Sequence, residues 1–121
     1  MDLQIVCGSD RDDLESTRRV FRARLDEAGV HPAISREMML AFTEITTPRA
    51  DYPPEAKITA DLEINKDELV LRLQLSAALV ADARQSGEQD LMLHLLGDKV
   101  SRVVDADQGT VVTVTKRRLG R

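Results

Sequence analysis

The sequence predicts a two-layer α/β sandwich, in which helices cover one face of a mostly antiparallel sheet. Two observations predict this class. Apolar and polar residues alternate along 57–65 and 69–75, as in a hairpin with one buried face, and 100–105 and 110–116 form a second pair of strand-like segments joined by a turn. Between residues 14 and 45, apolar residues instead recur at helical spacing. Helices and hairpins with one apolar side each bury those sides against each other in two layers.

The N-terminal part is expected to contain a strand and two helices. The run LQIVC (3–7) predicts the strand, and GSDRDD after it supplies a turn and candidate helix N-caps. The first helix places Gly29 where a C-terminal cap is expected, and its apolar positions are Leu14, Phe21, Leu25 and Ala28. The second helix opens at His31-Pro32, because proline is tolerated in a first turn. Its buried stripe is expected to be Ile34, Met38, Ala41, Phe42 and Ile45.

The C-terminal part predicts two hairpins with a helix between them. In the first hairpin, the segment 57–65 is expected to bury Ile58, Ala60, Leu62 and Ile64, and 69–75 returns after the turn NKDE. The run DLMLHLLGDKV then places Leu91, Met92, Leu95 and Leu96 at helical spacing. In the closing hairpin the turn ADQG leaves Gly109 free to adopt a positive φ. The order is therefore β-α-α-β-β-α-β-β.

Length, charge and composition narrow the class of protein. A chain of 121 residues is expected to form a single domain, 1–121, large enough to bury a core without disulfides. The net charge of −4 argues against nucleic acid as a partner, and the basic run KRRLGR (116–121) is expected to be a solvated tail. No apolar run is long enough to cross a membrane. The opening residues have no signal-peptide pattern and Cys7 is the one cysteine, so a cytoplasmic location is expected.

Three motifs carry a resemblance to a known family. MMLAFTEI is similar to a helix of the form L-A-x-x-E-x-x-x-N, LMLHLLGDKV to a segment that ends in Asp-x-Val, and QGTVVTVTKRRL to a closing hairpin Gly-Thr-Thr-Val-x-x-x-Lys. Together with the order of elements, they resemble the GHKL ATPase fold and, within it, the bacterial anti-sigma-factor serine kinases. The likeness spans nearly the whole chain. It implies a fold that in active relatives binds ATP and Mg²⁺.

The residues that such a nucleotide site needs are replaced at three positions. The helix asparagine that the family uses as an oxygen ligand to Mg²⁺ corresponds to Pro48, which has no side-chain donor or acceptor and tends to end a helix. Ser76 stands in place of the adenine-binding aspartate, and bulkier residues follow it where the family has glycines. Gly87 is left at the phosphate-binding turn, but two carboxylates beside it would repel a triphosphate. Ser76 and Gly87 are thus remnant positions, and no cofactor is expected.

Other candidate catalytic groups are weak. Glu44 matches the position that acts as general base in active members of the family, but without a bound phosphoryl donor we expect it to be vestigial. Cys7 has no neighbouring base in the sequence, and no cluster of Cys, His and Asp has the spacing of a metal site. His94 is expected at the margin of the core, and His31 as part of a helix entry.

A protein-contact surface is the remaining candidate site. Arg18 and Arg22 belong to a helix face that is either simply solvated or turned towards an acidic partner. The resemblance favours the second possibility, because the first helix and opening strand contribute to dimer and partner surfaces in that family. Met39 is expected near the surface, where methionine adapts to different partners.

The leading hypothesis is a non-catalytic, pseudokinase-like regulatory module that acts by protein–protein contact. Its expected partners are an anti-sigma-antagonist domain, a sigma factor or a second copy of the chain. A first alternative is an active serine kinase or ATPase with an altered site, which would need ATP and Mg²⁺ and would use Glu44 as base. A second alternative is an unrelated small α/β binding domain.

Overall fold

The computed structural model describes residues 2–8, 10–46, 56–76, 91–105 and 109–118. Its labelled elements are β1 (Asp2–Gly8), α1 (Arg11–Glu27), α2 (Pro32–Thr46), β2 (Lys57–Ile64), β3 (Glu68–Leu75), β4 (Lys99–Asp105) and β5 (Gly109–Arg117). Residues 91–96 form a further short helix. The predicted order of elements is confirmed, and each predicted segment agrees with an observed one to within a few residues.

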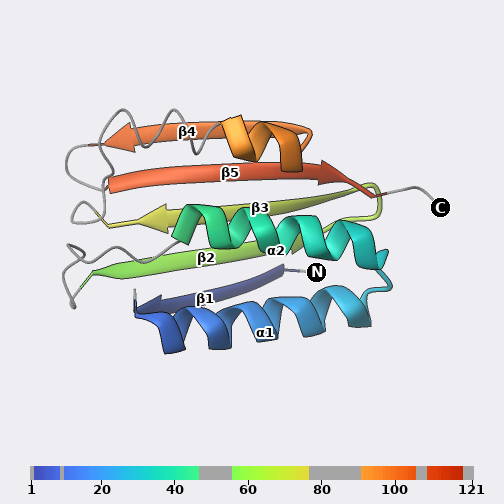
Figure 1. The fold of residues 1–121 in the computed structure, drawn as a ribbon, viewed down its shortest axis with the longest axis horizontal. Coiled ribbons are helices and arrows are strands. Elements are labelled where there is room, and N and C mark those ends of the chain that lie inside the picture. The colour runs from blue at the N-terminus through green and yellow to red at the C-terminus, as the bar shows by residue number, and fades with distance from the viewer. Residues whose placement is uncertain (1, 9, 47–55, 77–90, 106–108, 119–121) are drawn as a thin grey trace.

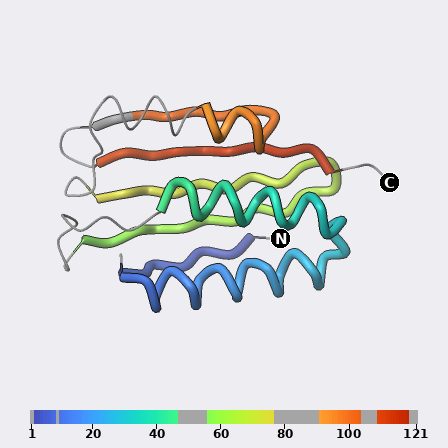
Figure 2. Tube along the Cα trace, viewed as in Figure 1, coloured from blue at the N-terminus to red at the C-terminus, as the bar shows by residue number. Residues whose placement is uncertain are grey.

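The sheet has five strands in the order β1-β2-β3-β5-β4, and all neighbours are antiparallel. The helices lie on one face of it, with α1 beside β1, α2 over the middle of the sheet and the short helix beside β4 (Figure 1). This is the predicted two-layer sandwich. The last strand, β5, is inserted between β3 and β4 (Figure 2).

The register of the strands explains which residues form the core. One row of paired positions crosses the whole sheet and is entirely aliphatic: Leu3, Leu62, Leu71, Val114 and Val100. Because side chains alternate along a strand, the neighbouring row points to the opposite, helix-free face. That row is polar, with Gln4, Asp61, Arg72, Thr113 and Ser101.

Helix α1 begins and ends at recognisable caps. The carboxylate of Asp10 accepts a hydrogen bond of 2.9 Å from the backbone N–H of Asp13, as an N-cap does. The helix ends at Glu27, and Gly29 after it adopts a φ of 74°, the left-handed conformation predicted for it. Phe21 on the buried face meets Phe42 of α2 edge to face, with ring centroids 5.7 Å apart. This contact joins the two long helices.

Helix α2 is buried over a wider arc than its sequence pattern predicts. All five positions of the predicted stripe are buried, but so are Ser35, Met39 and Thr46. The expectation that Met39 lies near the surface is therefore wrong, since only 5% of it is exposed. The reason is that α2 packs on the sheet with one side and against α1 with another, so that both sides exclude water.

The short helix at 91–96 corrects another prediction. Leu93 is fully buried, whereas Leu91, Met92 and Leu95 are exposed. His94 is also exposed, so it does not lie at the core margin as expected. A helix of under two turns touches the sheet along a narrow line, and here that line runs through Leu93 and the half-buried Leu96.

The start of the basic run is not a solvated tail. Lys116 lies on the helix-covered side of β5, and its ammonium group donates to Glu37 Oε2 of α2 at 3.0 Å and to the carbonyl of Leu96 at 2.8 Å. Arg118 donates to the carbonyls of Asn65 and Ala28. These contacts tie strand β5 to α2, to the short helix and to the end of α1.

Candidate functional site

The positions expected to be remnants of a nucleotide site are only partly within the described residues. Glu44 lies in the last turns of α2, is half-buried and is not free of interactions. Ser76 follows β3 directly; its hydroxyl oxygen is buried and has no hydrogen-bond partner among the described residues. Pro48 and Gly87 lie outside the described residues. The loss of the magnesium and phosphate positions therefore stays a prediction.

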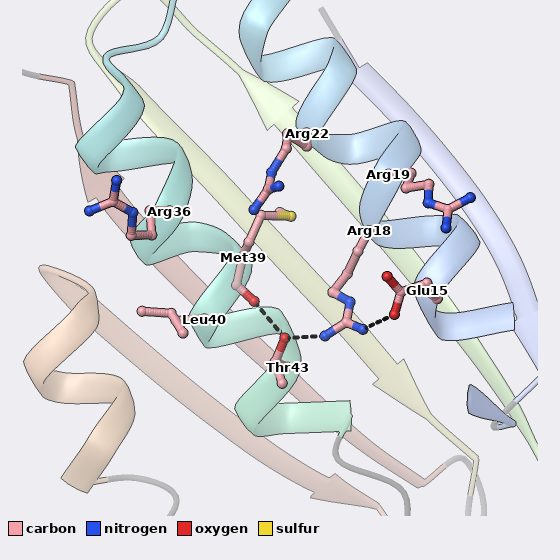
Figure 3. A pocket seen from close by; sticks show the side chains of 8 residues that line it. All are labelled: Glu15, Arg18, Arg19, Arg22, Arg36, Met39, Leu40 and Thr43. Atoms are coloured by element: carbon pink, nitrogen blue, oxygen red, sulfur yellow. Dashed lines mark hydrogen bonds and ion pairs between the residues drawn. The ribbon is translucent and has the colours of Figure 1, made fainter. Parts of the chain in front are cut away.

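A hollow within the described residues lies between α1 and α2 (Figure 3). It has a volume of about 400 Å³ and is lined by Glu15, Arg18, Arg19, Arg22, Arg36, Met39, Leu40 and Thr43. We call this hollow the α1–α2 groove. Its lining residues come from α1 and α2, so a molecule bound there would rest on these two helices.

Arg18 is held in place across the groove. One guanidinium nitrogen donates to the hydroxyl of Thr43 on α2 at 2.7 Å, and the other to Glu15 Oε2 on its own helix at 2.7 Å (Figure 3). The Thr43 hydroxyl in turn donates to the carbonyl of Met39 at 2.9 Å. A guanidinium fixed by a hydroxyl and a carboxylate keeps its orientation, which reduces the entropy lost when a ligand binds.

The other arginines of the groove have no ion-pair partner among the described residues. Arg19, Arg22 and Arg36 are exposed, and none of them has an ion pair within the described part of the chain. In Figure 3, Arg22 reaches from α1 over Met39, while Arg19 and Arg36 flank the groove on its two sides. Four arginines against one glutamate make the groove locally basic on a chain whose net charge is −4.

All three residues expected to bind a partner line this groove. Arg18, Arg22 and Met39 are brought together there, although their role in binding stays a prediction. The sequence reasoning missed Arg36 and Leu40 of α2. Both stand outside the apolar stripe and are four residues apart, a spacing that places them on one side of a helix.

A second, smaller hollow continues the groove towards the start of α2. It has a volume of about 300 Å³ and is lined by Arg22, Asp26, Pro32, Ser35 and Arg36. Arg22 and Arg36 line both hollows, so the two form one depression along the helix pair. The hydroxyl of Ser35 is buried without a hydrogen-bond partner among the described residues.

Cys7 does not have the surroundings of a nucleophile. Burial raises the pKa of its thiol above the ordinary value, and the nearby carboxylates of Asp13 and Asp10 act in the same direction. A hydrogen bond with Thr17 and the charge of Lys57 oppose the rise. The thiolate is the reactive form, so a raised pKa keeps Cys7 unreactive near neutral pH.

Within the described residues, no three His, Cys, Asp or Glu side chains come close enough together to hold a metal ion. No helix in the part of the chain that the structure describes is long and apolar enough to cross a membrane.

Five antiparallel strands with β5 inserted beside β3, covered on one face by helices, form the predicted α/β sandwich. Among solved structures, the crystal structure of the RsbU and RsbW domains of Rv1364c from Mycobacterium tuberculosis matches 100% of this chain, with a TM-score of 0.70. The identity is 14%, and the chain spans 33% of that longer one. No family model matches the sequence, and no curated protein matches it. At this identity the likeness shows the fold alone.

Proposed function

We propose that this chain is a non-catalytic regulatory module that acts by contact with other proteins, on a GHKL-type fold that no longer binds a magnesium nucleotide. Its partner would be a small regulatory protein such as an anti-sigma-antagonist domain or a sigma factor. A homodimer is a further assembly that we expect. A cytoplasmic location is part of the same proposal.

The observation that carries the proposal is the α1–α2 groove. It combines an arginine held across two helices, three arginines without an ion pair to any described residue, and a half-exposed leucine in one accessible depression. Surface arginines beside an apolar floor are typical of protein contacts, in which arginine and methionine are enriched. The likeness to a solved structure that contains an RsbW domain supports the choice of regulatory partners.

The sequence supports the loss of nucleotide binding. Pro48 cannot supply an oxygen to Mg²⁺, and Leu79 adds bulk where the family has a glycine. Glu88 and Asp90 would place negative charge beside the phosphates. Each replacement removes a different interaction, so restoring one of them would not restore the site.

A second candidate function is favoured by Ser76. A buried hydroxyl without a partner among the described residues is unusual, and Ser76 stands where the family binds adenine. An altered nucleotide site with Glu44 as base is therefore the alternative. Replacing Glu44 with Ala should then abolish any transfer of phosphate to a candidate partner.

Isothermal titration with ATP and Mg²⁺ distinguishes the two candidates. The proposal expects no binding heat at ligand concentrations well above those that saturate active kinases. Micromolar binding would overturn it and favour the altered kinase. The variant Ser76→Ala is the matched control, because a signal that disappears with it would locate the nucleotide at the predicted position.

A further inference from the structure

We infer that the α1–α2 groove is a docking site for an acidic amphipathic helix of a partner protein. This inference rests on the proposed function and specifies the chemistry of the partner. It is argued from the length of the groove, the sign of its charge, its apolar floor and its walls, which are helices and not a strand.

The groove is long enough for a short helix. The two hollows together extend along α1 from Glu15 to Asp26, which at 1.5 Å per residue is roughly 16 Å. That length corresponds to about three helical turns. A helix lying there would rest on both α1 and α2.

The charge of the groove selects an acidic partner. Arg19, Arg22 and Arg36 make no ion pair with any described residue, and they stand on both sides of the depression. Arg18 and Arg22 are four residues apart on α1, so their guanidinium groups match carboxylates four residues apart on a facing helix. Opposite charges across a contact fix the register and speed association.

The floor of the groove selects an amphipathic partner over a simple polyanion. Leu40 is 50% exposed, and Met39 lies beneath the arginines. An apolar stripe on the partner would remove the Leu40 surface from water, which a phosphate backbone cannot do. Among the described residues no aromatic side chain lines the groove, so the usual stacking platforms for nucleobases are missing there.

The walls of the groove favour a helix over an extended peptide. An added strand gains its affinity from the free N–H and C=O groups of a sheet edge. The groove lies between two helices, whose backbone groups are already paired within each helix. Recognition must therefore come from side chains, which a helix presents along one face at intervals of three and four residues.

The test uses a labelled synthetic peptide as the probe. We would titrate the full chain against a helical peptide of about 15 residues with glutamates at every fourth position beside a leucine stripe. Fluorescence anisotropy should report saturable binding that weakens as salt is raised from about 0.05 to 0.3 M. The double variant R22E/R36E should bind at least about tenfold more weakly.

The matched control changes the same charge elsewhere. Lys57 and Lys99 are exposed on β2 and β4 and neither lines the groove, so K57E/K99E should bind the peptide like the wild type. A peptide with lysine in place of glutamate should prefer R22E/R36E to the wild type. Circular dichroism of each variant shows whether it is folded, and the preference of the lysine peptide is a gain that misfolding cannot produce.

Four results would overturn the inference. One is equal binding of the acidic peptide to R22E/R36E and to the wild type. Another is undiminished binding of a peptide whose leucines are replaced by serine. The third is displacement of the peptide by a single-stranded oligonucleotide, and the fourth is a dimer of the wild type that R22E/R36E dissociates, which would make a second copy the occupant. If no peptide binds and titration with ATP gives no binding heat, only this inference fails. Binding of ATP would overturn the proposed function instead.

Discussion

At the scale of single residues, Lys116 shows how one charge can join three elements. Its side chain is only 11% exposed, and its ammonium group bonds a carboxylate on α2 and a carbonyl at the end of the short helix. A buried cation with two good partners costs little to keep but much to remove, because its partners are left unpaired.

We therefore expect Lys116→Met to lower the free energy of unfolding by about 2 kcal/mol, although methionine has a similar length. Urea denaturation followed by circular dichroism measures the change. Lys99→Met is the control, since Lys99 is exposed on β4 and should tolerate the substitution. Equal stability of both variants would show that the contacts of Lys116 contribute nothing.

A second prediction at this scale concerns Cys7. Burial, followed by two carboxylates, raises the pKa of its thiol in the folded chain. The folded state thus favours the neutral thiol and is stabilised by it. This stabilisation is fully present below the thiol pKa of the unfolded chain, and it is lost as the pH rises through the thiol pKa of the folded chain. Thiolate absorbance in a pH titration should show a higher midpoint for the folded chain than for the chain in urea.

Thr17 offers a control for this titration. Its hydrogen bond with Cys7 lowers the thiol pKa, so Thr17→Val should move the midpoint further upwards. A folded midpoint at or below the unfolded one would contradict the assignment of burial as the main cause.

At the scale of elements, the short helix at 91–96 depends on a close approach at Gly97. The Gly97 amide donates to the Leu93 carbonyl at 2.8 Å, and the next amide, of Asp98, donates to the Thr115 carbonyl of β5. A Cβ at Gly97 would lie 2.5 Å from Cγ1 of Val114. Glycine is therefore required where the chain passes from this helix to the sheet.

Gly97→Ala should cost about 1–3 kcal/mol of stability by overpacking. Thermal unfolding of the variant would measure this loss. Val114→Ala makes room for the added methyl group, so the double variant should lose less stability than the two single variants together. Gly29→Asn is the comparison variant, because nothing lies within 4 Å of a Cβ at Gly29 and asparagine tolerates its positive φ. A Gly97→Ala variant as stable as the wild type would mean that the helix can shift freely.

The elements themselves could be predicted because their periodicity is local. The stripe of α2 and the alternation in β2 both follow from one-sided burial, and both are confirmed. The exposure of Leu91 and the burial of Met39 could not be predicted in the same way. Both depend on how a helix packs against its neighbours in the fold, and the order of apolar residues within one helix does not indicate this.

The candidate site was predictable in part for the same reason. Arg18 and Arg22 share one helix face in the sequence, but their proximity to Arg36 depends on the antiparallel packing of α1 and α2. The bond from Arg18 to Thr43 joins residues that are 25 positions apart, and nothing in either segment indicates it.

At the scale of the whole molecule, the order of the strands sets the order of local stability. β3 pairs with β2 on one side and β5 on the other, whereas β1 and β4 each pair with one neighbour. Opening an inner strand breaks the hydrogen bonds to two neighbouring strands and exposes the core. It therefore costs more free energy than fraying of an edge strand.

Hydrogen exchange followed by mass spectrometry should therefore find the slowest amides in β3 and β5 and faster ones in β4. Leu71 and Val114, which are fully buried and paired, should exchange only with global unfolding. In β4, the N–H groups that do not bond to β5 should exchange first. Uniform protection across all five strands would contradict this hierarchy.

The insertion of β5 between β3 and β4 also has a consequence for synthesis. On the ribosome, β3 emerges well before the strand that will lie next to it, because 33 residues separate Leu75 from the start of β5 at Gly109. Until β5 is synthesised, the side of β3 that it will cover has unpaired backbone groups, and strands of other chains can pair with it. A product cut before Gly109 would keep that edge permanently, and such fragments should be recovered as aggregates or bound to chaperones.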